Sequence, residues 1–136
     1  MPEDCRKSLP DPALMLRGIR ESDISKQTGR VKKTAFIPRK NGKDDAGLSV
    51  SQPNGENRGQ IKGRMGNESG VFCSLLAARI RSIKESGVTL EVCLKPTERD
   101  PFHSLIKGVP TDRESTALAT RLAQRLAEIS DEYLPA

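Results

Sequence analysis

The chain has 136 residues, a formal net charge of +5, 35% hydrophobic residues and 3% aromatic residues. This length accommodates one domain with a single core, and the hydrophobic fraction lies below the ~45–50% of typical globular domains. No run of ~18 apolar residues occurs, which excludes a transmembrane helix, and the acidic N-terminus lacks the apolar region of a signal peptide. We therefore expect a cytoplasmic protein without a membrane partner.

The cysteines favour free thiols over a metal centre. Cys5, Cys73 and Cys93 are widely spaced and form no CxxC pair, and His103 is the only histidine. One histidine with cysteines at this spacing cannot complete a zinc site of the usual kind. Cys73 and Cys93 lie in apolar segments, where free cysteine behaves as a small buried residue. We expect a reducing compartment, no structural metal and no cofactor.

Composition divides the chain into a tail and one domain. Residues 1–12 contain three prolines among mixed charges and predict a flexible N-terminal tail. The remainder, 13–136, is predicted to be a single domain. Within it, residues 52–70 are rich in glycine and asparagine and almost devoid of apolar residues. A segment of this kind predicts a mobile loop.

The first half of the domain predicts three short strands. Apolar runs bounded by glycine or proline indicate strands over 13–19, 31–37 and 47–51. Asn41-Gly42 supplies the positive φ angles of a tight reversal. We therefore predict a hairpin between the strands at 31–37 and 47–51.

The second half predicts helices and further strands. Apolar residues recur at helical spacing over 71–86, and alternation predicts a strand over 88–94. A further strand is predicted over 102–109, and residues 111–114 match a capping box that opens a helix ending near 130. This order predicts an α+β fold, namely one two-layer domain in which two helices cover a small, mostly antiparallel sheet.

The positive charge is concentrated in the first half of the chain. The first 70 residues hold 14 Lys and Arg against 9 Asp and Glu, and the remaining 66 hold 9 of each. Such an excess attracts nucleic acid or an acidic protein surface, although most charge runs are simply solvated loops. The main functional hypothesis is a non-enzymatic accessory protein that binds a partner macromolecule through a basic face. Its predicted binding residues are Arg17, Lys26, Arg30, Lys32, Lys33, Arg39, Lys40 and Lys43.

The alternative hypothesis is a small enzyme. Arg17, Ser49 and His103 each interrupt an apolar, strand-like run. Together they would suit a phosphate-bearing or dinucleotide substrate, with Arg17 binding an anion and His103 acting as a general base. Its orienting carboxylate would be Asp100, Glu91 or Glu98. Structural histidines are nevertheless commoner than catalytic ones.

Two family resemblances bear on these hypotheses. The Arg17-Gly18 strand followed by Ser49-Val50-Ser51 is similar to the opening of ADP-ribosyltransferase-like domains. That resemblance implies that Arg17, Ser49 and Ser51 hold a nicotinamide dinucleotide. The wider pattern Arg-Gly-Ile, Ala-Phe, Gly-Leu-Ser-Val, His-x-x-Ile and Ala-x-x-Leu-Ala, from Arg17 to Leu126, resembles small uncharacterised bacterial proteins. This second resemblance implies a single domain and no particular activity.

Overall fold

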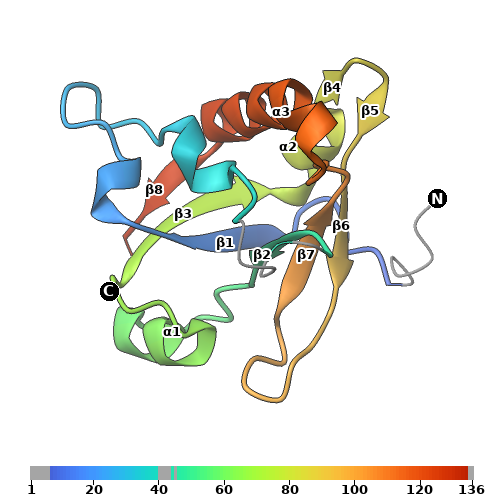
Figure 1. Ribbon diagram of the computed structural model, residues 1–136. Coiled ribbons are helices and arrows are strands. Elements are labelled where there is room, and N and C mark those ends of the chain that lie inside the picture. Colours follow the sequence, from blue (N-terminus) through green and yellow to red (C-terminus); the bar gives the residue numbers. More distant parts are fainter. Residues whose placement is uncertain (1–6, 40–43, 45, 135–136) are drawn as a thin grey trace.

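The computed structural model describes residues 7–39, 44 and 46–134 (Figure 1). The helices are α1 (Arg58–Met65), α2 (Ala77–Ser82) and α3 (Thr116–Ile129), and the 3-10 turns are η1 (Glu21–Asp23), η2 (Lys33–Phe36) and η3 (Arg113–Ser115). The strands are β1 (Leu14–Ile19), β2 (Leu48–Val50), β3 (Val71–Leu76), β4 (Lys84–Glu85), β5 (Val88–Thr89), β6 (Glu91–Leu94), β7 (Ser104–Lys107) and β8 (Asp131–Tyr133).

All pairings between these strands are antiparallel. Two three-stranded sheets have the orders β1-β3-β8 and β2-β7-β6, and β4 and β5 form a separate ribbon. The α+β prediction is confirmed, but the strands are divided among several sheets instead of forming one. The two larger sheets meet where Leu16 and Ser51 exchange backbone hydrogen bonds, with N···O distances of 2.6 and 2.8 Å.

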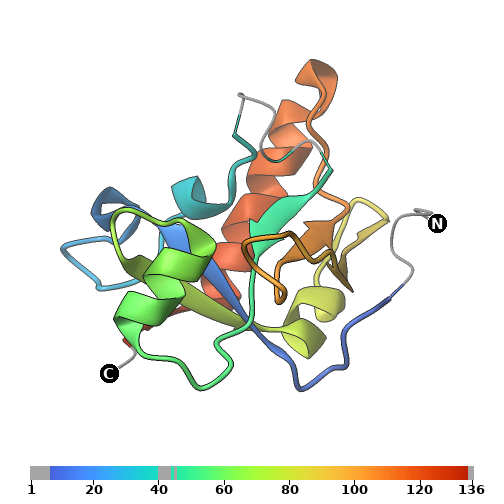
Figure 2. The ribbon, with the colours of Figure 1, turned by 90° about the horizontal axis from the view of Figure 1, so that it is seen from below.

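The sheet of β1, β3 and β8 is covered on both faces. Met15 and Cys73 lie on the face that joins the main core beneath α3. Leu16 and Phe72 lie on the other face, where they pack with Ile61 of α1. Figure 2 shows α1 on the side of this sheet opposite α3. Because both faces are covered, β1 and β3 carry apolar residues without strict alternation.

Helix α3 is confirmed, although it begins later than predicted. Its apolar stripe is buried against η2 and the main core: Ala119, Leu122, Ala123, Leu126 and Ala127. The capping box predicted at 111–114 does not form. The 3-10 turn η3 precedes the helix, and neither its N-cap, Asp112, nor the N-cap of α3, Ser115, makes a side-chain cap. Among the helices that the structure describes, none is long and apolar enough to cross a membrane.

The predicted hairpin between 31–37 and 47–51 is wrong. Val31 makes only an isolated bridge to Ile24, and the chain then forms the 3-10 turn η2. Ala35 and Phe36 are 4% and 0% exposed, and an extended strand would send two consecutive side chains to opposite faces. The tight turn instead buries both. Strand β2 is present as predicted, but its hydrogen-bonded partner is β7.

The helix predicted over 71–86 is also wrong in its first half. Residues 71–76 form strand β3, and only 77–82 are helical. A short apolar run after a glycine fits a buried strand as well as a helix, so the outcome depends on what it can pair with. Here β1 lies antiparallel to it, with Arg17 opposite Cys73.

Residues 58–65 form helix α1 within the segment predicted to be a loop. Asn57 accepts a hydrogen bond from the Gln60 amide at 2.9 Å, and the Gln60 side chain accepts one from the Asn57 amide at 3.0 Å. The helix ends at Gly66, whose φ of 68° is left-handed. Ile61 is fully buried and docks the helix on the sheet. Glycines at 59 and 63 weaken helix propensity and hide this helix in the composition.

The described part of the predicted tail pairs with β6. The Leu9 amide donates to the Val92 carbonyl at 3.0 Å, and the Leu94 amide donates to the Lys7 carbonyl at 2.9 Å. Cys93 is disulfide-bonded, so the free thiol expected there is wrong. Disulfides persist mainly in oxidising compartments, which weakens the basis for expecting a reducing one. Residues 1–6, including Cys5, lie outside the described residues.

Cys73 provides a test of this cysteine arrangement. It is a free, fully buried thiol, and burial raises its pKa to about 12. We expect Cys73 to resist thiol reagents in the native protein and to react on denaturation, because the thiolate is the reactive form. When the protein is denatured without reduction, a colorimetric titration should detect fewer than three reactive thiols per chain. Three thiols would contradict the disulfide at Cys93.

Candidate functional site

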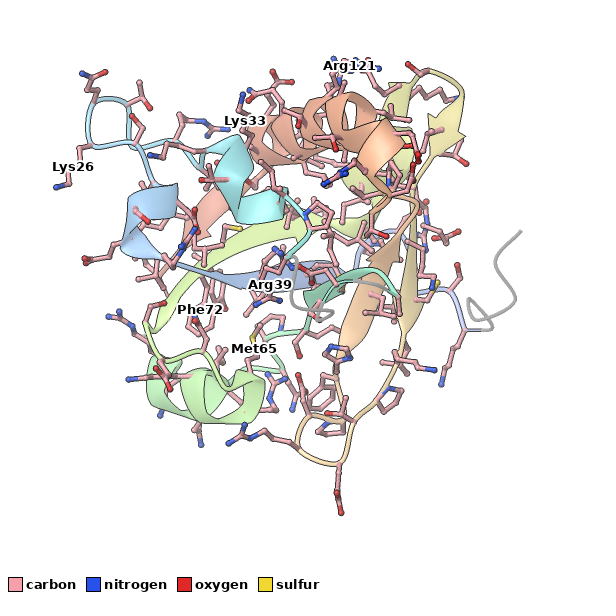
Figure 3. The ribbon with its side chains drawn as sticks, in the orientation of Figure 1. Lys26, Lys33, Arg39, Met65, Phe72 and Arg121 are labelled. Atoms are coloured by element: carbon pink, nitrogen blue, oxygen red, sulfur yellow. The ribbon has the colours of Figure 1, made fainter. Side chains whose placement is uncertain are left out.

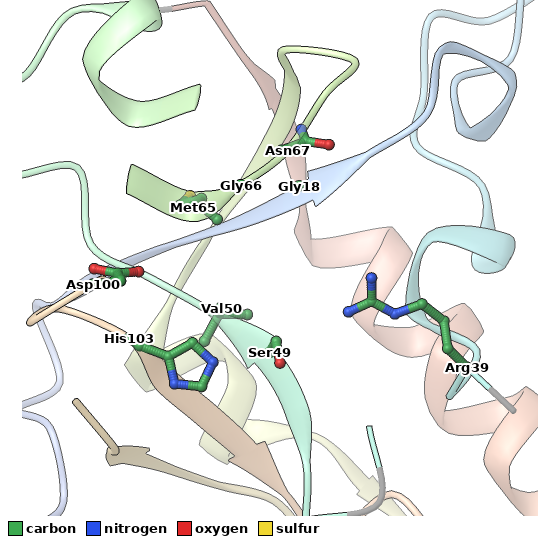
Figure 4. A pocket seen from close by; sticks show the side chains of 9 residues that line it. All are labelled: Gly18, Arg39, Ser49, Val50, Met65, Gly66, Asn67, Asp100 and His103. Atoms are coloured by element: carbon green, nitrogen blue, oxygen red, sulfur yellow. The ribbon is translucent and has the colours of Figure 1, made fainter. Parts of the chain in front are cut away.

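A small polar pocket lies where β1, β2, the start of β7 and the end of α1 converge (Figure 4). It encloses about 110 Å³. Polar side chains on its wall come from distant parts of the sequence: Arg39, Ser49, Asn67, Asp100 and His103. We call this the Arg39 pocket. A second hollow of about 260 Å³ follows β1 and shares Gly18, Arg39 and Asn67 with it.

Gly18 shapes the floor between these two hollows. A Cβ atom at this position would lie 2.8 Å from Cγ of Asn67, which is too close for any real contact. The absence of a side chain therefore lets Asn67 lie over β1. Asn67 is held there by a hydrogen bond from its Nδ2 to the Val71 carbonyl at 2.8 Å.

Arg39 presents a partly exposed guanidinium to the pocket. Its Nε donates to Oδ2 of Asp44 at 3.0 Å and its Nη2 donates to Oδ1 at 3.2 Å, a two-point contact along one edge. The Arg39 amide also donates to Oδ2 at 2.8 Å. The side chain remains 46% exposed. No atom in the described part of the chain binds its Nη1, so the outer edge of the guanidinium is open to a ligand.

Asp44 is a buried carboxylate shared by two arginines. Arg17 Nη2 lies 3.5 Å from its Oδ2, on the side away from solvent. Burial alone would raise the pKa of Asp44, but hydrogen bonds from Arg39 and the positive charge of Arg17 outweigh it and hold the pKa below its usual value. Two guanidinium groups around one carboxylate leave the cluster with a net positive charge.

Arg17 is occupied by the protein itself. Its Nε donates to the Ala35 carbonyl at 2.6 Å and its Nη1 donates to the Ser49 carbonyl at 2.9 Å. Only 3% of the residue is exposed, and burial lowers the pKa of its guanidinium, against the opposing charge of Asp44. Arg17 therefore ties β1, η2 and β2 together. Its role in this structure is to stabilise the wall behind the pocket, and it presents no free edge of its guanidinium to a ligand.

Ser49 and His103 lie on the same face of the second sheet. Ser49 is opposite Leu105 in the antiparallel register. His103 precedes Leu105 by two residues, so its side chain shares that face and is a diagonal neighbour of Ser49. Both line the Arg39 pocket (Figure 4). Within the described residues, no group hydrogen-bonds the Ser49 hydroxyl.

The tautomer of His103 follows from its one hydrogen bond. Its Nδ1 lies 2.8 Å from the Lys95 carbonyl, which can only accept, so Nδ1 carries a proton. In the neutral ring, Nε2 then keeps a lone pair. No partner for Nε2 occurs among the residues that the structure describes. A carbonyl therefore orients this histidine, where the sequence suggested a carboxylate.

Of the suggested carboxylates, Asp100 and Glu91 are engaged elsewhere, and Glu98 is exposed and does not line the pocket. Asp100 is 4% exposed and accepts from Arg64 Nη1 at 2.6 Å. Arg64 also donates to Ser51 Oγ at 2.6 Å and to Glu56 at 2.8 Å. Glu91 pairs with Arg81 at 2.5 Å. Ser51 is fully buried in the Arg64 cluster and does not line the pocket.

The basic residues expected to form one face are dispersed. Lys26, Lys32 and Lys33 are exposed, and Figure 3 places Lys26 on a loop distant from Arg39. Arg30 instead bonds Asp131 and the Glu128 carbonyl, both at 3.0 Å. Lys40 and Lys43 lie outside the described residues.

The structure thus joins two residues of the enzyme hypothesis and one of the binding hypothesis to others that were not foreseen. Ser49 and His103 meet at the pocket, Arg39 replaces Arg17 beside them, and Asn67 and Gly18 complete the wall. A turn-like Asn after Gly66 was the only sequence signal for Asn67. Within the described ranges, no three His, Cys, Asp or Glu side chains are grouped to hold a metal. The chain matches no protein-family model, and comparisons with curated proteins and with solved structures found no significant similarity.

Proposed function

We propose that the protein binds a small phosphate-bearing ligand in the Arg39 pocket. The observation that supports this most is the convergence of three polar groups without partners in the described chain: Arg39 Nη1, Ser49 Oγ and His103 Nε2. These three groups are open to solvent, whereas the buried polar side-chain atoms of the described residues are all hydrogen-bonded. Several polar groups that converge on one hollow without protein partners are typical of a ligand-binding site.

The chemistry of these groups suits a phosphate. The outer edge of an arginine fork gives two parallel donors to an anion, and a serine hydroxyl adds a third. The net positive charge of the Arg17–Asp44–Arg39 cluster attracts the anion. A volume of about 110 Å³ accommodates a group of phosphate size rather than a whole cofactor. The lone pair on His103 Nε2 would accept a proton from a bound water or hydroxyl group, which is the role of a general base.

Phosphate binding should depend on Arg39. We expect Arg39→Gln to weaken inorganic phosphate binding by about 10- to 100-fold, because a charge-assisted hydrogen bond contributes about 1.5–3 kcal/mol. Lys26→Gln is the matched control, since it removes one positive charge from an exposed loop away from the pocket. Isothermal titration calorimetry gives both affinities. Equal loss in the two variants would show only general charge attraction and would contradict the site.

Binding of a macromolecule through dispersed lysines is the second candidate. Lys32 and Lys33 are adjacent, exposed and without an ion-pair partner among the described residues. If nucleic acid is the partner, its affinity should fall steeply with salt, because bound phosphates release counterions. The double variant Lys32→Gln, Lys33→Gln should reduce the slope of log K against log salt by about 1 for each phosphate that a lysine no longer neutralises. An unchanged slope in a filter-binding series with single-stranded DNA would exclude these lysines from such an interface.

A further inference from the structure

A larger groove lies on the other side of Arg39. It has a volume of about 410 Å³ and runs between residues 37–39 and the start of α3. Its walls combine apolar surface with two cationic side chains: Ile37, Pro38, Pro110 and Ala119 with Arg39 and Arg113. Arg39 therefore lines both this groove and the Arg39 pocket.

The volumes of the two spaces indicate which part of a ligand each could hold. Pockets that hold small organic molecules usually measure ~300–1,000 Å³. The Arg39 pocket, at about 110 Å³, falls well below that range, whereas the groove, at about 410 Å³, lies within it. A ligand whose phosphate binds Arg39 must place its organic part in a neighbouring space.

The hollow along β1 is the weaker choice for that organic part. Its polar groups already bond one another: Thr34 Oγ1 donates to Asp23 at 2.7 Å, and the Arg20 amide donates to Asp23 at 2.9 Å. At about 260 Å³ it is also below the usual range.

The groove offers apolar surface that the fold leaves uncovered; Ile37 lines both spaces, but Pro38 and Pro110 line only the groove. Ile37 is 38% exposed and is one of three large hydrophobic residues exposed in the described chain. Two prolines beside it present flat, rigid faces. At the other end, no ion pair or hydrogen bond occupies the Arg113 side chain among the described residues. An arginine in this position stacks on a planar ring or pairs with an anion.

We propose that this groove binds the planar organic part of the ligand whose phosphate binds Arg39, and that the ligand class is a nucleoside phosphate. This inference rests on the proposed function of the Arg39 pocket. A base would pack between Ile37 and the prolines, with the phosphate reaching Arg39. The charge matches, because the described lining of the groove holds Arg39, Arg113 and one carboxylate, Asp112, which already accepts from Ser115 Oγ at 2.7 Å. Arg39 keeps one guanidinium edge beyond its contact with Asp44.

The test compares nucleoside monophosphates with inorganic phosphate. Adenosine, guanosine, cytidine and uridine 5′-monophosphate are titrated into the full chain beside phosphate alone. At least one nucleotide should bind about tenfold or more tightly than phosphate, because its organic part buries additional surface. Ile37→Asn should remove most of that advantage and leave the affinity for inorganic phosphate unchanged.

Leu76→Asn is the matched control, since Leu76 is 41% exposed and does not line the groove. Thr116→Trp is a second variant, which fills the groove from an exposed helix position and should act as Ile37→Asn does. Circular dichroism confirms that each variant is folded. Nucleotides that bind no tighter than phosphate, or an advantage that survives both variants, would overturn the groove proposal while leaving the phosphate site intact. Failure of phosphate itself to bind would overturn the proposed function and the groove proposal together.

Discussion

Arg64→Ala is expected to lower the free energy of unfolding by about 3–5 kcal/mol, the cost of removing one partner from a buried ion pair. The Arg64 side chain is 8% exposed and the Asp100 side chain 5% exposed, with 2.6 Å between Nη1 and Oδ1. Its guanidinium also lies 5.0 Å from the Phe102 ring. Without Arg64, the only donor left to the Asp100 carboxylate among the described residues is the Phe102 amide, at 3.0 Å.

Urea unfolding of the variant measures this loss, and amide exchange locates it. We expect faster exchange throughout α1, because Arg64 is the main polar link between this helix and the loop that carries Asp100. Slow exchange in wild-type α1 would itself exclude the mobile loop predicted for 52–70. Arg79→Ala is the control, since Arg79 is exposed and no side-chain contact is formed by it in the described structure. Similar stability of the two variants would contradict a structural role for the Arg64 cluster.

The features predicted correctly from the sequence are those set by local periodicity. Helix α3 has 14 residues, long enough for its apolar stripe to repeat several times and exclude a strand. Its exact start was not predicted, because the 3-10 turn η3 takes the place of the first predicted turn of the helix. Strand β7 is likewise bounded by a glycine and a proline in the sequence.

The errors occur where distant pairing decides between local alternatives. Residues 71–76 satisfy helical spacing, yet β1, more than fifty residues earlier, pairs with them along their whole length. Adjacent Phe72 and Cys73 are both fully buried because the sheet is covered on each face. The local signals for that second covering layer are weak, because two glycines in α1 lower helix propensity and only the Asn57–Gln60 capping pair and Gly66 mark its ends.

The candidate site, like the fold, was predictable from the sequence only in part. Ser49 and His103 could be placed together because both interrupt short strands, and strands pair. The sequence could not show that Arg17 lies apart from Ser49 and His103, because it does not say which face of β1 the Arg17 side chain occupies. Gly18 faces Asn67, so its neighbour Arg17 points to the opposite side, toward Ala35. The importance of Arg39 depends on its contact with Asp44, and the sequence does not show which carboxylate an arginine pairs with.

Asp44→Asn is expected to destabilise the protein by about 3 kcal/mol, the lower end for breaking a buried ion pair. The Asp44 side chain is fully buried between Arg17 and Arg39. An asparagine keeps a similar shape but removes the negative charge, which leaves two guanidinium groups facing each other. Arg17 retains its hydrogen bonds to the Ala35 and Ser49 carbonyls, and these limit the decrease in the free energy of unfolding.

The same variant should flatten part of the acid unfolding of the wild-type protein. Because the pKa of Asp44 is lower when folded, its stabilising contribution is fully present above the unfolded value of about 4. That contribution disappears as the pH falls through the folded pKa. The pKa of Glu91 is also lowered, since hydrogen bonds from the Val92 amide and Arg81 outweigh the effect of burial. Asp44→Asn should therefore retain the share of the pH dependence that belongs to Glu91.

Urea unfolding from pH 7 to pH 2 separates these contributions. Wild type should lose stability below about pH 4, Asp44→Asn should lose less, and Glu91→Gln serves as the control that keeps the Asp44 share. Phosphate affinity gives an independent readout at neutral pH. Without Asp44 to orient it, Arg39 keeps its charge but loses its fixed edge, so binding should weaken although no ligand-contacting residue has changed. Wild type and Asp44→Asn could instead lose the same free energy of unfolding as the pH falls. That result would show that Arg17 and Arg39 are held in place by their other partners and not by this carboxylate.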